Sequence, residues 1–372
     1  MISPTLNIYS GKKVLITGHT GFKGSWLALW LKQLGANVTG VSIDIPSEPS
    51  HFKATKLSEQ IDDYRLDICD GEALKSLVKK IQPDFVFHLA AQALVRHSYE
   101  KPIETIVTNA IGSANVLEAL RTLDKTVVAV MITSDKAYDN VEWVWGYRET
   151  DRLGGKDPYS ASKGMAELAI RTYVESFFNA PDSNVRVGIA RAGNVIGGGD
   201  WATDRIVPDC MKTWSRNEVV DIRSPEATRP WQHVLEPLSG YLLLGALLQQ
   251  SRDRHGEAYN FGPSSQQNYS VRKLIDAMAK YWDYVHWKDT SQSMQHPQEA
   301  GLLKLNCDKA LFDLQWQPTL KFEETVGMTV SWYKQYYQNV KQKKPDSMRD
   351  FTISQIEEYV QLASQRGIVW IN

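Results

Sequence analysis

The chain has few cysteines and no pattern of metal ligands. Its 372 residues include only three cysteines, the isolated Cys69, Cys210 and Cys307. An odd number of isolated cysteines suits neither a disulfide framework nor a zinc site with paired ligands. The eight histidines also lack the short spacings of a metal site. We therefore predict no metal and no disulfide scaffold.

The sequence also lacks long apolar runs and an excess of either charge. The longest apolar stretches, such as residues 241–248, are far shorter than the roughly 20 residues that span a bilayer. Lys plus Arg number 42 and Asp plus Glu 43, so the net charge of −1 provides no broad basic surface for nucleic acid. Residues 1–13 contain no basic segment followed by an apolar signal core. We expect no membrane or nucleic-acid partner, and a cytoplasmic location.

The remaining composition is that of a globular protein, with strand and helix patterns alternating through the first half. Hydrophobic residues make up 42% of the chain and charged residues 23%. The predicted strands are residues 14–17, 37–43, 85–90, 126–133 and 185–191, and the predicted helices are residues 25–34, 72–80, 105–123 and 161–178. Repeated β-α-β units predict an α/β fold with a doubly wound parallel sheet.

The second half has a different pattern. Glycine and proline breaks, many Trp and Arg residues and short helices follow Asn194, with better helices at residues 271–281 and 322–337. We predict that residues 1–193 form the sheet domain, with segments near 230–262 returning to it. Residues 194–372 would form mainly a smaller, mixed α/β substrate-binding domain.

Three glycines with GxxGxxG spacing join the first predicted strand to the first predicted helix. Gly18 would permit a tight turn, Gly21 would let the backbone approach a pyrophosphate, and Gly24 would let helix and strand pack closely. The start of the helix offers free N–H groups to phosphate oxygens. Because a strand precedes this segment and a helix follows it, the pattern predicts a Rossmann-type NAD-binding domain. The cofactor contacts predicted in this turn are Gly18, Thr20, Gly21, Phe22, Lys23 and Gly24.

An acidic residue follows at the spacing expected for the adenosine ribose. Asp44 comes at the end of the second predicted strand, twenty residues after Gly24. A carboxylate there would accept hydrogen bonds from the ribose and repel a 2′-phosphate, which favours NAD over NADP. The alternative is a solvated loop acid. Asp67 and Ile68 lie beyond the next strand, where they would border the adenine.

A tyrosine and a lysine four residues apart open the helix after the fifth strand. Asp157 suits the N-cap of this helix and Pro158 its first position. Tyr159 and Lys163 then share one helix face. A lysine charge near a phenol lowers the phenol pKa, so Tyr159 could take a proton from a sugar hydroxyl as hydride leaves the same carbon. Lys163 could also hold the nicotinamide ribose.

The glycine pattern with Tyr159 and Lys163 resembles the extended short-chain dehydrogenase/reductase family, and the resemblance covers nearly the whole chain. Most members act on nucleotide sugars. The resemblance implies that Ser134 bonds the hydroxyl to be oxidised, that Asn194 contacts the substrate diphosphate and that Arg229 grips it with a bidentate guanidinium. It also implies that Leu89, Ala90 and Ala91 lie beside the nicotinamide ribose.

The segment after Ser134 favours one reaction within this family. The 4,6-dehydratases of the family oxidise C4 of a hexose, eliminate water across C5 and C6, and return the hydride to C6. Asp135 matches the acid that protonates the leaving hydroxyl. Lys136 stands where most of these enzymes have Glu, and it would act either as the C5 base or as a charge that stabilises the enolate. With residues 18–27 and 231–234, this pair resembles most closely the branch that dehydrates CDP-glucose.

Other assignments stay open at this point. Arg96 would reach a sugar or phosphate, or else form a surface ion pair, and Arg205 would meet the nucleotide. The alternatives to dehydration are a nucleotide-sugar epimerase or reductase, and a non-catalytic NAD-binding regulator. Because hydride leaves and returns, we predict that NAD is retained. The resemblance further implies pairing of residues 105–123 and the Tyr159 helix with a second copy, as a homodimer or a tetramer.

Overall fold

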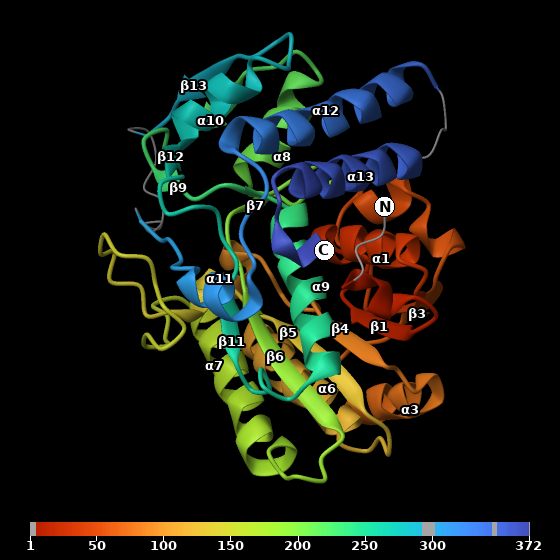
Figure 1. The fold of residues 1–372 in the computed structure, drawn as a ribbon. Helices are drawn as coiled ribbons and strands as arrows, with labels where there is room; N and C mark the ends of the chain where they lie inside the picture. The colour runs from red at the N-terminus through yellow and green to blue at the C-terminus, as the bar shows by residue number, and fades with distance from the viewer. Residues whose placement is uncertain (1–4, 292–301, 344–347, 372) are drawn as a thin grey trace.

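The computed structural model describes residues 5–291, 302–343 and 348–371, and a parallel sheet of seven strands forms their centre (Figure 1). The strand order is β11-β6-β5-β4-β1-β2-β3, and every neighbouring pair is parallel, as predicted. The strands are β1 (Lys13–Thr17), β2 (Asn37–Ser42), β3 (Asp62–Arg65), β4 (Phe85–His88), β5 (Val127–Ile132), β6 (Val185–Arg191) and β11 (Ala258–Asn260). Chain order reverses between β1 and β4, which is where doubly wound sheets bind ligands.

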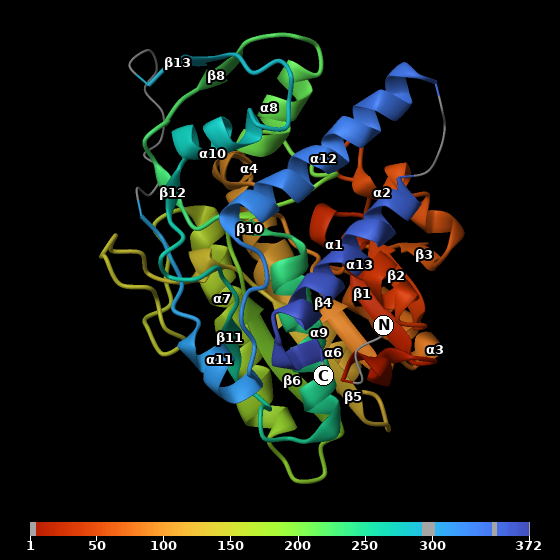
Figure 2. The ribbon, with the colours of Figure 1, turned by 45° about the horizontal axis from the view of Figure 1, so that its top comes forward.

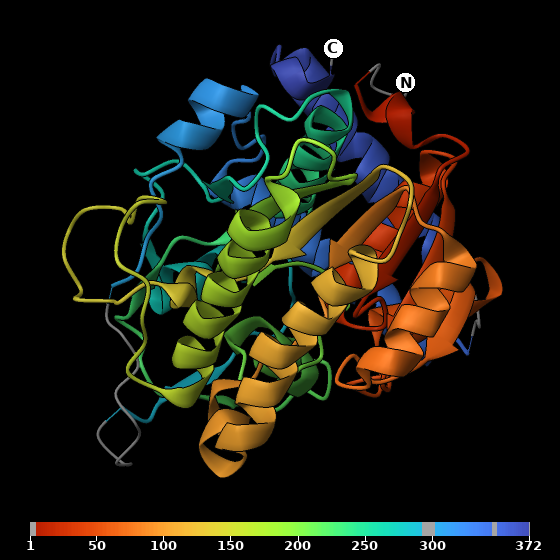
Figure 3. The same ribbon diagram turned by 90° about the horizontal axis from the view of Figure 1, so that it is seen from below.

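Helices cover both faces of this sheet, because alternate strand residues enter two separate cores. In β5, Val128 and Val130 enter one core, and Ala129 enters the other. The helices of the first face are α1 (Phe22–Gln33), α9 (Leu235–Gln250) and α13 (Arg349–Gln365). The helices of the second face are α3 (Gly71–Ile81), α6 (Gly112–Leu120) and α7 (Pro158–Tyr173). Figure 3 shows the yellow-green helix α7 beside the orange helix that contains α6.

A smaller group of elements, here called the cap, lies beyond the carboxyl ends of the strands (Figure 2). The cap comprises α8 (Ile206–Trp214), β8 (Val220–Ile222), β9 (Thr228–Arg229), β12 (Tyr269–Ser270), α10 (Val271–Met278) and β13 (Trp287–Asp289). Helix α12 (Phe322–Lys341) packs against α10 and against α13, and so joins the cap to the first face. The cap therefore stands over the edge of the sheet where the glycine turn lies.

The remaining elements are short. They are α2 (His51–Ala54), α4 (Val95–Glu100), α5 (Pro102–Ile106), β7 (Val195–Ile196), β10 (Gln232–His233) and α11 (Asp308–Leu314), with 3₁₀ turns at Leu6–Tyr9, Leu57–Glu59, Asp135–Ala137 and Val369–Ile371. Two π turns, Val107–Ile111 and Val174–Phe178, continue α5 into α6 and extend α7. In the part of the chain that the structure describes, no helix is long and apolar enough to cross a membrane.

Some predicted boundaries were wrong by one to three residues. The first helix begins at Phe22 rather than at residue 25, because Gly21 already adopts the extended conformation of an N-cap. The second strand ends at Ser42, two residues before Asp44, and β4 ends at His88 rather than at Ala90. The predicted helix cap at Asp157 and Pro158 is confirmed, with the Asp157 carboxylate accepting a hydrogen bond of 2.9 Å from the Ser160 N–H.

Candidate active site

The turn between β1 and α1 fits the pyrophosphate of a dinucleotide. Gly18 has a φ of +78°, and a Cβ at this residue would lie 2.6 Å from the Ala90 nitrogen and 2.8 Å from the Leu89 carbonyl carbon. A Cβ on Gly24 would lie 2.1 Å from the Gly18 oxygen. Only glycine therefore lets the turn approach β4 and α1 this closely. With Gly21 as N-cap, the N–H groups of the first helical turn have no partner inside the helix and can bind phosphate.

The other predicted cofactor residues surround this turn. The Thr20 hydroxyl donates a hydrogen bond of 2.6 Å to the Asp44 carbonyl, which leaves the exposed Asp44 carboxylate beyond the end of β2. Phe22 packs against the first core, and Ala91 follows Ala90 in the segment that leaves β4 beside Gly18.

Of the two residues predicted to border the adenine, Asp67 is exposed and Ile68 is buried. The Asp67 carboxylate accepts a hydrogen bond of 2.8 Å from the Cys69 N–H. The Ile68 side chain is buried in the second core against Gly112, and its carbonyl accepts a hydrogen bond of 2.9 Å from the Asn115 amide. The Ile68 side chain is therefore part of the second core, a position that the sequence spacing did not indicate.

Helix α7 places Tyr159 and Lys163 together at the carboxyl edge of the sheet. Both residues are buried, and the Lys163 Nζ lies 6.0 Å from the centre of the Tyr159 ring. The Lys163 amine makes no hydrogen bond or ion pair within the described residues. Burial and the charge of Lys23 lower the pKa of Lys163 to about 7, while Glu167 opposes this shift. This lysine is therefore only weakly held in its charged form and is available to a ligand hydroxyl.

The prediction that the pKa of Tyr159 is lowered was wrong: the pKa is raised, and Lys163 is not among the groups that shift it. Burial raises the pKa of Tyr159, and the charge of Asp135 raises it further. Interaction with Ser134 and the positive charge of Arg205 oppose that rise. The groups that favour the Tyr159 phenolate therefore come from the loop after β5 and from the cap, rather than from the next turn of α7.

Lys23 extends from the glycine turn toward the same cluster. Its Nζ lies 6.0 Å from the centre of the Tyr241 ring. Burial and the charge of Arg205 lower the pKa of Lys23 to about 8, and Asp135 opposes the shift. Lys23 therefore lies close enough to Asp135 and Lys163 for charge interactions: Asp135 acts on the pKa of Lys23, and Lys23 acts on the pKa of Lys163.

The residues that carry the predicted acid leave β5 in a short loop, residues 133–138, here called the acid loop. Ser134 caps the 3₁₀ turn Asp135–Ala137: its hydroxyl accepts a hydrogen bond of 3.2 Å from the Lys136 N–H and donates one of 2.9 Å to the Asp135 carboxylate. Asp135 is buried, and Lys136 is half-buried. The ion pairs within the described residues do not include one between Asp135 and Lys136. The loop is therefore fixed by the Ser134 hydroxyl, and the carboxylate and the amine remain separate groups.

The segment after β6 encloses Asp135 from its other side. The Asn194 amide donates a hydrogen bond of 3.3 Å to the Asp135 carboxylate, and Asn194 has a left-handed backbone with φ of +53°. Gly193 lies directly against the same carboxylate. Asn194 therefore contacts the predicted acid.

The arginines predicted for the substrate differ in their surroundings. Arg205 is close to Tyr159 and forms an ion pair of 2.8 Å with Asp200. Arg96 is exposed and forms an ion pair of 3.0 Å with Asp204. The second of the two readings of Arg96, a surface ion pair, is therefore the arrangement observed. Arg229 lies in β9 of the cap, where its guanidinium donates a hydrogen bond of 2.8 Å to the Thr228 carbonyl.

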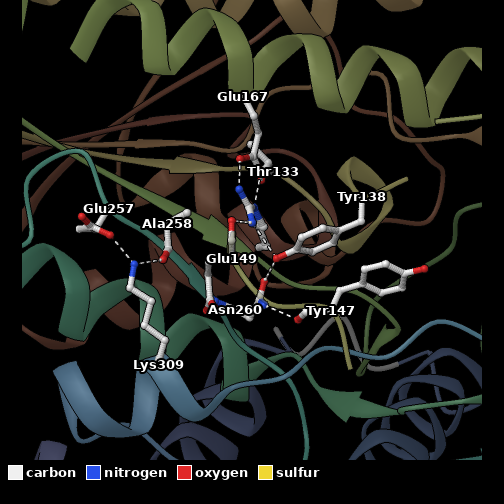
Figure 4. Close-up of polar contacts among 10 residues, drawn as sticks. Thr133, Tyr138, Tyr147, Glu149, Glu167, Glu257, Ala258, Asn260 and Lys309 are labelled. Atoms are coloured by element: carbon white, nitrogen blue, oxygen red, sulfur yellow. Dashed lines mark hydrogen bonds and ion pairs between the residues drawn. The ribbon is translucent and has the colours of Figure 1, made fainter. Parts of the chain in front are cut away.

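A buried polar cluster behind the acid loop was missed by sequence reasoning (Figure 4). Glu167 forms a fully buried ion pair with Arg191, at 2.5 Å, and accepts a hydrogen bond of 2.6 Å from the Thr133 hydroxyl. Arg191 also donates a hydrogen bond of 2.6 Å to the Tyr138 hydroxyl, which in turn donates one of 2.8 Å to Asn260. The available signal was Glu167 itself, a charged residue four positions after Lys163 on the inner face of a helix.

Asn109 was missed as well. It is buried in the π turn Val107–Ile111. Its carbonyl oxygen accepts a hydrogen bond of 2.8 Å from the Gln92 N–H, and its amide donates one of 2.8 Å to the Ser162 hydroxyl. Asn109 thereby ties the segment after β4 to α7. A π turn at such a position is common near functional sites.

Comparison with known proteins places these residues in a defined group. Residues 15–329 match the family model described as GDP-mannose 4,6 dehydratase. The CDP-glucose 4,6-dehydratase of Salmonella typhimurium is 47% identical over 332 residues, which cover 88% of this chain and 92% of that protein. The UDP-glucose 4-epimerase of Mycoplasma pneumoniae is 24% identical, over 87% of this chain and 97% of that protein.

Solved structures share the fold. DesIV, the dTDP-glucose 4,6-dehydratase of Streptomyces venezuelae solved with NAD and TYD bound, superposes with a TM-score of 0.70 at 21% identity over 87% of this chain and 97% of that one. The epimerase Mth375 of Methanothermobacter thermautotrophicus superposes with a TM-score of 0.77 at 24% identity over 92% of this chain and 98% of that one. Dehydratases and epimerases thus share this architecture, and the side chains at the site must distinguish them.

Proposed function

The chain belongs to the GDP-mannose 4,6-dehydratase family, and from that membership we propose that it is an NAD-dependent hydro-lyase that converts CDP-D-glucose to CDP-4-dehydro-6-deoxy-D-glucose and water. The observation that carries the reaction type is the position of Asp135, a buried carboxylate beside Ser134 and in electrostatic contact with Tyr159. An epimerase needs only an oxidation centre, whereas this site adds an acid to it. The identity of 47% with a CDP-glucose enzyme carries the choice of nucleotide.

The first step uses the oxidation centre. Tyr159 takes the proton of the C4 hydroxyl, Ser134 orients that hydroxyl, and Lys163 holds the nicotinamide ribose. Bound NAD would supply the acceptor for the C4 hydride and later the donor for C6, and C5 takes back a proton as C6 receives the hydride. Arg205 assists Tyr159, because its positive charge favours the phenolate.

The second step uses the acid loop. Once C4 is a ketone, the C5 proton is acidic and can be removed. Asp135 donates a proton to the C6 hydroxyl, which leaves as water, and Lys136 acts as the C5 base or stabilises the enolate. The hydrogen bonds from Ser134 and Asn194 hold the Asp135 carboxylate in place for this transfer.

The binding assignments are part of the same proposal. The glycine turn would hold the pyrophosphate and Asp44 the adenosine ribose, with Asp67 and the backbone of residue 68 near the adenine. Leu89 to Ala91 would border the nicotinamide ribose. Asn194 and Arg229 would contact the substrate diphosphate, and Arg96 would reach it only on leaving Asp204. We assign residues 1–193, with the segments near 230–262, to NAD binding and residues 194–372 mainly to substrate binding.

An isotope label tests the whole reaction. CDP-glucose with deuterium at C4 is incubated with the purified protein, once without added NAD⁺ and once with it, and the sugar nucleotide is analysed by mass spectrometry and NMR. We expect loss of one water, with the deuterium transferred to the C6 methyl group. Turnover only in the presence of added NAD⁺ would contradict retention of the cofactor but not the reaction. Dehydration of UDP-, dTDP- or GDP-glucose but not of CDP-glucose would mean that the substrate carries a different nucleotide.

The competing functions give different products. An epimerase would return the deuterium to C4 without loss of mass, and a reductase would consume reduced cofactor. A non-catalytic NAD-binding regulator would change no sugar nucleotide and would keep its biological activity as Tyr159→Phe. The buried Asp135 argues against all three, because none of them needs an acid at C6.

The role of Lys136 is decided by a pH–rate profile of Lys136→Glu. A shift of the basic limb relative to the parent would identify Lys136 as the C5 base. An unchanged profile with a lower rate would identify it as an electrostatic stabiliser.

Assembly and location complete the proposal. Helices α5 to α7 expose apolar side chains, among them Ile103 (71%) and Leu168 (54%). We propose that this surface pairs with a second copy in a homodimer, or in a tetramer built from two dimers, and that the protein works in the cytoplasm. Light scattering on the parent and on Leu168→Glu tests the pairing, since a charge at the interface should reduce the mass to that of a monomer.

A further inference from the structure

Three separate segments of the candidate site meet at one buried ion pair. Glu167 belongs to α7, the helix that carries Tyr159 and Lys163. Arg191 ends β6, two residues before Gly193. The side chains of this ion pair are 0% and 1% exposed. The two carboxylate oxygens accept separate hydrogen bonds, of 2.6 Å from Nε and 2.5 Å from Nη2 of Arg191, which is the bidentate arrangement that fixes both partners in orientation.

The acid loop is attached to this ion pair at both of its ends. At the first end, the Thr133 hydroxyl donates a hydrogen bond of 2.6 Å to Glu167. At the other end, the Tyr138 hydroxyl accepts a hydrogen bond of 2.6 Å from the third nitrogen of Arg191, and the guanidinium lies 4.8 Å from the centre of the Tyr138 ring. In Figure 4, Glu167 and Thr133 lie together above the Tyr138 hydroxyl. Ser134, Asp135 and Lys136 all lie between these two attachments.

Asn260 closes the cluster from β11. Its side-chain oxygen accepts a hydrogen bond of 2.8 Å from the Tyr138 hydroxyl. Its side-chain amide donates hydrogen bonds to the Tyr147 and Asn306 carbonyls. Its own N–H donates a hydrogen bond of 2.8 Å to the Glu149 carboxylate. The Tyr138 hydroxyl therefore has one donor and one acceptor partner and a single orientation.

We propose that Arg191, held by Glu167, is a positioning residue for dehydration. It acts through the Tyr138 hydroxyl, and this contact keeps the acid loop at a fixed distance from Tyr159 and Lys163 on α7. This inference rests on the proposed function. The base for C4, Tyr159, lies on α7, and the elimination acid lies on the loop, so the two half-reactions share one substrate only while the loop keeps its distance from the helix. Small displacements of a catalytic group are costly, because proton transfer needs hydrogen-bond geometry.

Tyr138→Phe is the substitution that removes the hydrogen bond between Arg191 and the acid loop with the least disturbance to the fold. Replacement of Glu167 or Arg191 would leave a buried charge without its partner and destabilise the fold. The phenyl ring of Tyr138→Phe keeps the volume and the packing, and it leaves the ion pair in place. Tyr147→Phe is the matched control. Tyr147 is also buried, and its ring lies 5.1 Å from that of Tyr138. Its hydroxyl accepts a hydrogen bond of 2.7 Å from the Val141 N–H and donates one of 3.0 Å to the Asn140 side chain. In Figure 4 the Tyr147 hydroxyl points away from the cluster.

Two measurements test the inference. In steady state, Tyr138→Phe should lower kcat by about tenfold or more, as expected for a misplaced catalytic group, with little change in the KM for CDP-glucose. In single-turnover experiments, quenched samples should contain the oxidised hexose, lighter than substrate by two hydrogens, ahead of the dehydrated product. Hydrogen–deuterium exchange in residues 133–140 should be faster than in the parent. Tyr147→Phe should resemble the parent in kcat and in the exchange of residues 133–138.

The outcomes separate this inference from the proposed function. If the parent protein dehydrates CDP-glucose and Tyr138→Phe matches Tyr147→Phe in kcat and exchange, the inference fails while the proposed function stands. A rise in KM with unchanged kcat would also overturn it, because that pattern indicates a role in binding. If the parent protein does not dehydrate any sugar nucleotide, the proposed function fails. The exchange measurement, which needs no turnover, then still tests whether the Tyr138 hydroxyl holds the loop.

Discussion

A Cβ on Gly193 would lie 1.8 Å from Oδ2 of Asp135, so the backbone after β6 forms one wall of the carboxylate site. The Ser134 hydroxyl also contacts this carboxylate and donates a hydrogen bond of 2.9 Å to Oδ1. Two segments that follow the neighbouring strands β5 and β6 thus contact the acid. The glycine is needed here for its small size, since no side chain could stand at this point while Asp135 keeps its position.

The first prediction follows from that contact. Gly193→Ala should displace the Asp135 carboxylate and lower kcat for dehydration by about a hundredfold, the cost of misplacing a catalytic group by about 1 Å. Affinity for NAD should stay near that of the parent, because the glycine turn is on other strands. Steady-state kinetics and calorimetric titration with NAD⁺ measure the two quantities.

Gly262→Ala is the control for that substitution. A Cβ at Gly262 would lie 3.4 Å from the Cys307 Sγ, an ordinary contact distance. This variant should keep most of the parent activity. Equal losses in both alanine variants would mean that the effect is general to this part of the fold rather than a result of the contact with Asp135.

The second prediction separates the two half-reactions. Asp135→Asn keeps the size of the side chain but cannot protonate the C6 hydroxyl, so it should oxidise C4 and stop there. Tyr159→Phe lacks the base for C4 and should not oxidise at all. We expect each to lower dehydration by at least about a hundredfold, the usual range for removing a general acid or base. Mass spectrometry of single-turnover samples checks this: only Asp135→Asn should give the species lighter by two hydrogens.

The third prediction concerns the choice of cofactor. The Asp44 backbone is fixed by the Thr20 hydroxyl, and its carboxylate lies exposed beyond β2. Asp44→Ala should weaken NAD⁺ binding by about tenfold, the value of one or two hydrogen bonds to a charged group, and should reduce the preference over NADP⁺. Calorimetric titration with both nucleotides measures this. Asp62→Ala, at the opposite end of the neighbouring strand β3, should bind both as the parent does; if Asp44→Ala does so too, Asp44 is a solvated loop acid.

The sheet and the glycine turn could be predicted because their signals are local. Continuous β-branched strands such as Val127–Ile132 indicate burial on both faces, and the spacing of Gly18, Gly21 and Gly24 needs only the strand and helix that flank it. The same holds for the N-cap at Asp157. The start of α1 was predicted three residues late because an extended glycine gives no periodic signal of its own.

The parts that could not be predicted depend on contacts between distant segments. Nothing in the sequence places Gly193 on Asp135, or Arg191 on Glu167, because the register of β5 against β6 brings those pairs together. The pKa of Tyr159 was predicted to fall because only its helical neighbour was considered. Its burial and the charge of Asp135 are properties of the folded chain.

The last prediction concerns Lys163 and the pH dependence of stability in the cofactor-free protein. In the folded chain its pKa is about 7, against an ordinary value of 10.5. Below pH 7 the amine is protonated in both states, and the folded state bears the full cost of the buried charge. Between about 7 and 10.5 the unfolded chain binds the proton and the folded chain does not, so the stability of the parent rises with pH through this window.

Lys163→Met should therefore stabilise the protein most at pH 6, by on the order of 5 kcal/mol given the size of the pKa shift. The advantage should shrink as the pH approaches 10, while dehydration is lost at every pH. Chemical denaturation of the parent and the variant across this range measures the difference in the free energy of unfolding. Lys79→Met, an exposed position on α3, should differ little from the parent at any pH. A Lys163→Met advantage that is constant with pH would come from packing alone, and it would contradict a buried amine that titrates near neutrality.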